Sequence, residues 1–203
     1  TSLSGGSNPT TFNISAAYSA IQFVSALSDQ NKNQTASVGL SLGHSSLNQK
    51  LTVSVNGRYT YTNTNEVSIG GTPNMAPNLP PIFDEKGNLN YGAFRYPGAQ
   101  GSFPFAGLFQ PGNANTYSLS GGMNIGYKPI KGLDIGLALG YSYLSAKSKY
   151  FFTIASYDPI DSPVGTAYFG NNGNISYNVN PMLSYSRYIG KGNLRISLAG
   201  TLN

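Results

Sequence analysis

The side chains best suited to chemistry are few and scattered. The 203 residues contain a single histidine, His44, and no cysteine. Without cysteine there is neither a thiol nucleophile nor a cysteine zinc site, and a lone histidine lacks the further ligands that zinc requires. We therefore expect no catalytic residues, no metal site and no cofactor, and we assign His44 a structural role where a strand reaches a turn.

Two acidic stretches are candidates for other chemistry. The sequence Asp84-Glu85-Lys86-Gly87-Asn88 has the beginning of a calcium loop, but the oxygen-ligand pattern that closes on a glutamate is missing. A hairpin turn centred on the glycine is the better interpretation. Asp158 and Asp161 lie three apart in a loop that also contains Pro159 and Pro163, and this spacing alone does not establish a general acid–base pair.

A long segment between residues 65 and 113 is the strongest candidate for binding. Ordered connections of this length are usually functional. Its aromatic faces can stack on a sugar ring, pack against a partner protein, or pack on one another, and the sequence leaves these three interpretations open. The candidate residues are Phe83, Tyr91, Phe94, Arg95, Tyr96, Phe103, Phe105 and Phe109.

The composition is polar without being charged. Only 9% of residues are charged, against about a quarter in an ordinary soluble domain. The 25 Phe and Tyr residues and a net charge of only +5 argue against disorder. There is no apolar run long enough for a transmembrane helix, and the scattered lysines form no patch that would bind nucleic acid.

Period-two alternation recurs in segments of about ten residues, which predicts seven β-strands. In the clearest segment, 51–62, Leu51, Val53, Val55 and Tyr59 share one face. A change of phase predicts a bulge near Ala20, and Pro181 is expected at a bulge or at the outer end of its strand. The predicted strands are centred on residues 12–19, 36–43, 51–62, 117–127, 133–143, 175–186 and 194–202.

The polar faces of these segments favour a membrane barrel over a soluble β-sandwich. They carry Ser, Thr, Asn and Gly, whereas a soluble sheet covers its wet face with charged side chains. Tyrosines near the strand ends fit the aromatic girdles of a transmembrane barrel. We expect an all-β, antiparallel transmembrane β-barrel segment whose lumen-facing charges are Arg58, Asp134 and Arg195.

The connections alternate between short and long. Short turns are centred on residues 46–49, 129–132 and 190–193, and long connections cover 24–33, 65–113 and 149–174. Outer-membrane barrels have short periplasmic turns and long extracellular loops, and single-chain barrels have an even number of strands from eight upward. Seven strands should not close, so residues 1–203 are expected to form part of one larger barrel domain, with a plug and the remaining strands outside them.

Two stretches resemble the SusC/RagA-like TonB-dependent transporters of Bacteroidetes outer membranes. The first is Met75-Ala-Pro-Asn-Leu-Pro-Pro-Ile-Phe-Asp-Glu-Lys-Gly-Asn-Leu-Asn-Tyr-Gly92, which is similar to that family's proline-rich loop. The second is a strand, turn and returning strand from Tyr117 to Tyr143, with Ile-Lys-Gly-Leu at the turn. The resemblance extends over about residues 10–203.

The resemblance implies a 22-stranded barrel with an N-terminal plug, energised by the TonB complex and covered by a SusD-like lipoprotein that helps to import glycans or peptides. It further implies membrane lipid as a partner and the outer membrane of a Gram-negative bacterium, in the Bacteroidetes, as the location. The main alternative is a structural or scaffolding barrel in a surface or secretion complex. An outer-membrane enzyme or a small self-contained barrel is disfavoured by the odd strand number and by the missing catalytic residues.

Overall fold

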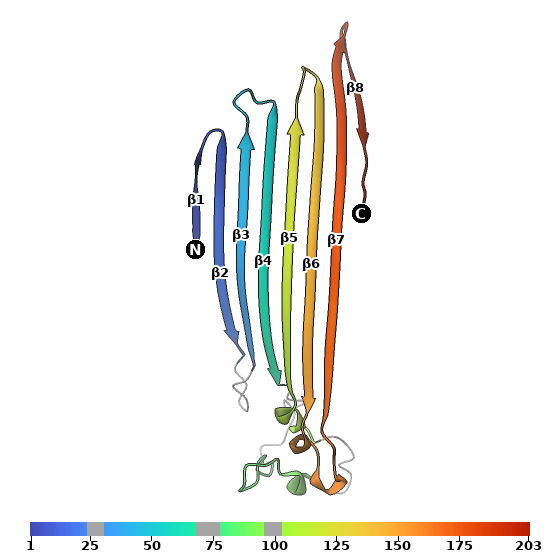
Figure 1. Cartoon of the computed structure of the whole chain (residues 1–203). Coiled ribbons are helices and arrows are strands. Elements are labelled where there is room, and N and C mark those ends of the chain that lie inside the picture. Colours follow the sequence, from blue (N-terminus) through green and yellow to red (C-terminus); the bar gives the residue numbers. More distant parts are fainter. Residues whose placement is uncertain (24–30, 68–77, 96–102) are drawn as a thin grey trace.

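The chain folds as a single antiparallel β-sheet (Figure 1). The computed structural model describes residues 1–23, 31–67, 78–95 and 103–203. Eight strands follow one another in chain order, each paired with the next, and short 3₁₀ helices lie in the long connections. The strands are β1 Ser2–Ser7, β2 Thr10–Gln22, β3 Lys32–Ser45, β4 Leu51–Val67, β5 Pro111–Tyr127, β6 Leu133–Phe152, β7 Thr166–Ile189 and β8 Gly192–Ala199, and the 3₁₀ helices are η2 Tyr91–Phe94, η3 Ala106–Phe109, η4 Ile154–Ser156 and η5 Pro159–Asp161.

The expected number of seven strands is wrong, because the chain also forms β1. This strand pairs with β2 from Ser2 opposite Ser15 to Ser7 opposite Thr10. Its sequence, SLSGGS, has a single large apolar residue, Leu3, and therefore no alternation that periodicity could detect. Pairing with the neighbouring strand, which only the tertiary fold provides, determines its conformation.

Strands β6 and β7 are also longer than expected. Their register runs without interruption from Leu133 opposite Tyr185 to Phe152 opposite Thr166. The connection between them is therefore residues 153–165, not 149–174. The alternation of apolar and polar residues did not predict these strand ends. Lys147 and Lys149 lie on the same face as the apolar residues of β6, so the two faces no longer differ in polarity there.

The two expected irregularities do not occur. Strands β2 and β3 keep one register from Thr10 opposite His44 to Gln22 opposite Lys32, so there is no bulge near Ala20. Pro181 lies inside β7 opposite Leu137 in the same unbroken register. Its carbonyl accepts a hydrogen bond of 3.0 Å from the Gly200 amide. Its missing N–H faces the same neighbour, where pairing stops at Ala199 and resumes as a bridge between Val179 and Leu202, so one ladder donor is lost at this point on the edge of the sheet.

The sheet has no second layer. A β-sandwich would bury Leu51, Val53, Leu137 and Leu139, yet all four are only partly covered. Among the described residues just four hydrophobic side chains are buried, and three of them, Leu89, Tyr91 and Phe105, lie in a long connection. Apart from Val67 at the end of β4, the large apolar side chains of the described strands are exposed or only partly covered, and the sandwich is excluded.

The short and long connections lie on opposite rims of the sheet, as expected (Figure 1). Four short turns, at residues 8–9, 46–50, 128–132 and 190–191, form the short-turn rim, and the connections after β2, β4 and β6 form the long-loop rim. Gly132 has a φ of +90°, and a Cβ atom there would overlap the backbone carbonyl oxygen of Ser186 in β7, so the turn before β6 requires glycine.

The short-turn rim climbs steadily across the sheet in Figure 1. Through the register, Thr10 at the start of β2 lies level with Val53 of β4. Leu51 lies level with Leu183 of β7, which then continues to Ile189 before its turn. A progressive stagger of this kind accompanies tilted strands in a barrel wall.

Candidate functional site

The register sorts the side chains of the sheet into a polar and an apolar face. One polar row runs through Gly39, Arg58, Ser120, Ser142 and Ser176 on successive strands. The three charges singled out from the sequence share this face. Asp134 is on it because it lies opposite Ser184, and Arg195 because it lies opposite Ser186; their lumenal position remains a prediction.

The polar face is the hollowed face of the sheet. A cavity of about 910 Å³ near the short-turn rim is bordered by residues from the β1–β2 turn as far as the segment after β8. One cavity can touch all of these strands only if the sheet curves around it. Its lining contains no Asp, Glu, Lys or Arg, and its polar side chains include His44 together with Thr11, Thr52, Ser54, Asn124 and Asn180.

Glycines on this face make room for amides of the neighbouring strand. A Cβ atom at Gly122 would lie 2.8 Å from the Asn56 side-chain oxygen, and the side chain of Asn178 lies against Gly140 in the same way. Both glycines are on strands whose apolar face is continuous. The missing side chains of these glycines thus leave room for the asparagine side chains of the neighbouring strands.

His44 lies on the apolar face close to the short-turn rim. Its Nδ1 is 2.7 Å from the Thr10 hydroxyl on the neighbouring strand. This cross-strand pair is consistent with the structural role that the sequence suggested. In the described ranges, no three His, Cys, Asp or Glu side chains gather in a way that could hold a metal ion.

The segment from Asp84 to Asn88 forms the expected hairpin turn. Phe83 and Leu89 pair across it, and Gly87 has a φ of +81°. The Asp84 carboxylate accepts hydrogen bonds from the Lys86 amide at 2.9 Å and the Asn88 amide at 2.8 Å. The bond from the Asn88 amide is the main reason why the pKa of Asp84 is lowered. The Asp84 carboxylate therefore accepts hydrogen bonds within the turn and stabilises it.

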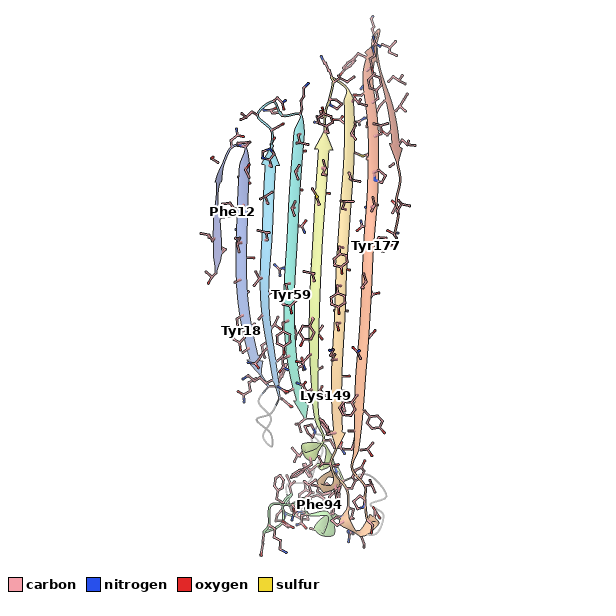
Figure 2. All side chains as sticks on the ribbon, in the orientation of Figure 1. Phe12, Tyr18, Tyr59, Phe94, Lys149 and Tyr177 are labelled. Carbon is pink, nitrogen blue, oxygen red and sulfur yellow. The ribbon has the colours of Figure 1, made fainter. Side chains whose placement is uncertain are left out.

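The loop aromatics pack mainly on one another. Tyr91 and Phe105 are buried with Leu89, and Phe94, Phe103 and Phe109 pack against them. The ring centroids of Tyr91 and Phe103 are 4.4 Å apart, and Phe94 meets Phe103 edge-on at 4.9 Å. Phe83 is 38% exposed. Tyr96 lies outside the described residues. We call this group, shown around Phe94 in Figure 2, the loop cluster.

Tyr91 carries an unusual polar atom inside the loop cluster. Its hydroxyl is buried and has no hydrogen-bond partner among the described residues. Burial, reinforced by the negative charge of Asp158, raises the pKa of Tyr91 to about 12. The group is therefore neutral at physiological pH, and its hydroxyl weakens the cluster instead of stabilising it.

An ion pair joins the loop cluster to the connection after β6. The Arg95 Nε donates to Asp158 Oδ2 at 2.8 Å, and its Nη2 contacts the other carboxylate oxygen. Asp158 also accepts from the Ile160 amide at the start of η5. The hydrogen bond from Arg95 is the main cause of the lowered pKa of Asp158. Asp158 is thus part of a loop-to-loop clasp.

Further contacts hold the two loops together on the long-loop rim. The Thr153 hydroxyl donates to the Phe109 carbonyl at 2.7 Å. Gln110 reaches the buried Ser156 hydroxyl at 3.3 Å. With the Arg95 clasp, these bonds make the loop cluster and the β6–β7 connection one packed unit beyond the end of the sheet.

The structure also reveals aromatic residues that the sequence interpretation missed. Tyr150, Phe152 and Tyr168 lie on the polar face at the long-loop rim. The rings of Phe152 and Tyr168 meet edge-on at 5.6 Å, and Tyr168 is 60% exposed. No clear signal in the sequence marks them, because beyond Tyr143 the two faces of β6 no longer differ in polarity.

Comparisons with family models and with curated proteins identify no relative of this chain. The sequence matches no known protein-family model and no curated protein. Within the described part of the chain, no helix is both long and apolar enough to cross a membrane. The functional assignment therefore depends on the two faces of the sheet and on the loops at its rim.

Proposed function

We propose that this chain forms part of the wall of an outer-membrane β-barrel that imports polar solutes. The observation that carries the proposal is the apolar face of the sheet. No other described element covers this face, yet it holds Leu, Ile, Val and Tyr side chains on seven consecutive strands. Only a hydrocarbon environment makes such a surface favourable.

The height of this apolar band supports the proposal. On three neighbouring strands the band covers eleven residues, or ten residue-to-residue steps, from Leu51 to Tyr61, Tyr117 to Tyr127 and Leu133 to Tyr143. At about 3.3 Å per residue this is about 33 Å along a strand. With the tilt of 35–45° usual in such barrels, it corresponds to about 25 Å across the membrane, the height of the apolar band in outer-membrane barrels.

The opposite face supports transport of uncharged polar solutes. Its side chains in the middle of the sheet are mainly Ser, Thr and Asn, with Gly between them. These side chains can exchange hydrogen bonds with a hydrated solute without holding it as strongly as an ion pair would. The aromatics Tyr150 and Tyr168 at its mouth offer ring faces to a sugar or peptide. This face is therefore suited to the glycans or peptides that the SusC/RagA resemblance implies.

Neither edge of the sheet has a second neighbour among the described strands. Because unpaired edges are costly in lipid, we propose that further strands complete the barrel. In this proposal the long-loop rim is extracellular. The packed loops beyond it would meet the incoming solute or a SusD-like lipoprotein, and TonB would supply the energy.

The test uses the full-length protein in its own outer membrane. Labelled neutral oligosaccharides and peptides are offered to cells with the gene intact, deleted, or carrying a short turn in place of residues 78–109. We expect uptake to require the gene and to stop when the proton-motive force is collapsed. The loop replacement should preserve barrel insertion while reducing uptake or co-purification of the lipoprotein.

Matched substitutions in β6 separate the lumen from the wall. Ser142 is on the polar face opposite Ser120, and the adjacent Tyr143 is on the apolar face opposite Leu119. Ser142→Trp should reduce uptake, whereas Tyr143→Trp should not, because an aromatic ring already occupies that interfacial position. If deleting the gene leaves uptake unchanged but dissolves a surface complex, a scaffolding barrel is the correct function.

A further inference from the structure

Two rows of amide and lysine side chains cross the apolar face next to the long-loop rim. Each residue lies opposite the next on the neighbouring strand. We call these two rows the amide–lysine belt. The first row is Gln34, Asn63, Asn115, Lys147 and Asn171, and the second is Gln22, Lys32, Asn65, Asn113 and Lys149.

The belt is positively charged and has no acidic residue. The strands contain two carboxylates, Glu66 and Asp134, and both lie on the polar face. Within the described ranges Lys32, Lys147 and Lys149 take part in no ion pair. Lys147 and Lys149 are exposed. The belt therefore presents three cations whose charge the sheet itself does not neutralise.

Four asparagines of the belt form a closed ring of hydrogen bonds. Asn65 donates to Asn63 at 3.0 Å, Asn63 to Asn115 at 2.8 Å, Asn115 to Asn113 at 2.8 Å, and Asn113 back to Asn65 at 2.8 Å. The Tyr61 hydroxyl also donates to Asn115, at 2.7 Å. The ring fixes the four amides in one orientation.

The ring lies between the lysines of two different strands. Lys32 is opposite Asn65 on one side, and Lys147 and Lys149 are opposite Asn115 and Asn113 on the other. The amide groups of Asn63, Asn65 and Asn115 each have a second N–H that the ring does not use. A fixed group of hydrogen-bond donors is thus flanked by cations on both sides.

The depth of the belt places it among lipid head groups. Its rows follow the row of Tyr61 and Tyr117 by two and four positions along the strands. With about 3.3 Å per residue and the usual tilt, these rows lie about 5 and 10 Å beyond the tyrosines. Tyrosines mark the interface, and the head-group layer extends about 5–7 Å outside the hydrocarbon. The first row therefore lies within the head-group layer and the second row at its outer side. Figure 2 shows Lys149 beyond the level of Tyr59 on this side.

We propose that the amide–lysine belt binds the phosphorylated head group of a glycolipid in the leaflet on the long-loop side. The proposal rests on the membrane-spanning wall proposed above. Lysine ammonium groups pair with phosphate oxygens, and fixed amides exchange hydrogen bonds with phosphate and sugar hydroxyls. The belt is continuous with the band that faces lipid tails, so a lipid that contacts the band brings its head group to the belt.

The test measures lipid binding by native mass spectrometry of the full-length protein in detergent. The probes are diphosphoryl lipid A, the same lipid without phosphates, and phosphatidylethanolamine. The variant combines Lys147→Gln and Lys149→Gln. Its matched control is Arg187→Gln, a cation on the same face of β7 near the opposite rim. At about fivefold per lysine, the double variant should lose about 25-fold in affinity for diphosphoryl lipid A, and the control less than twofold.

Three results would overturn the proposal: equal binding of the phosphate-free lipid, unchanged binding by the double variant, or an equal loss in the Arg187→Gln control. Heat-modifiable migration of each variant shows whether the barrel is folded. Insertion of the wild type into phosphatidylcholine vesicles is measured separately. Failure to insert contradicts the membrane wall itself, whereas insertion without phosphate-selective binding contradicts the belt alone.

Discussion

An arginine at position 139 should destabilise the protein far more than an arginine at position 138. Leu139 lies on the apolar face opposite Met123 and Val179, level with Val55. Because the apolar band of β4 runs from Leu51 to Tyr61, this row is close to the middle of the membrane. An arginine facing lipid at that depth costs about 2–4 kcal/mol, which is about a 30- to 800-fold change in the folding equilibrium.

Ala138 provides the matched control. It precedes Leu139 on the same strand but lies on the polar face, opposite Asn124 and Asn180. An arginine there enters a hydrated environment, and we expect a loss of less than about 1 kcal/mol. The free energies of unfolding of Leu139→Arg and Ala138→Arg are compared by urea titration of the full-length protein in phospholipid vesicles. Equal losses, or a larger loss at position 138, would refute the assignment of the two faces.

Three other predictions concern the loops and the rims. Arg95 lowers the pKa of Asp158, so the ion pair between them should hold above about pH 4 and loosen as the pH falls through the lowered value. The measurement is hydrogen exchange of the Ile160 amide. In the wild type this exchange should become fast only in acid, whereas in Asp158→Asn it should already be fast at pH 7. Tyr91→Phe removes a buried hydroxyl without a partner and should stabilise the loop cluster by about 1 kcal/mol, seen as slower proteolysis of residues 78–95, whereas faster proteolysis contradicts the buried position. On intact cells an impermeant maleimide should label a cysteine at Glu85 and spare one at Lys131, and the reverse pattern contradicts the proposed orientation.

The local sequence predicted most of the sheet because alternation is itself a local property. Successive side chains of a strand point to opposite faces, so the pattern from Leu51 to Thr62 identifies both the strand and its two faces without knowledge of its neighbours. The same holds for the hairpin at Asp84–Asn88, where the glycine and the asparagine supply the required turn geometry. The alternation of short and long connections follows from counting these strands.

Pairing across strands decided what alternation could not. β1 has no apolar pattern and exists through its hydrogen bonds to β2. The long-loop ends of β6 and β7 carry lysine and asparagine on the apolar face, so only the register shows that the strands continue. Pro181 lies inside β7, where its missing N–H removes a single bond on the side of the edge strand β8. Each of these outcomes depends on a neighbouring strand that the local sequence does not specify.

The loop aromatics show the same division between sequence and structure. Their number identified the segment, but their types left a sugar platform, a partner contact and a small core all open. The tertiary fold brought Tyr91, Phe94, Phe103 and Phe105 together and clasped them to the β6–β7 connection. In the same way the belt of lysines and amides exists only because the register aligns residues from six strands, β2 to β7. Sequence determined which side chains each strand offers to each face, and tertiary pairing decided which of them meet, since contacts between distant segments depend on register.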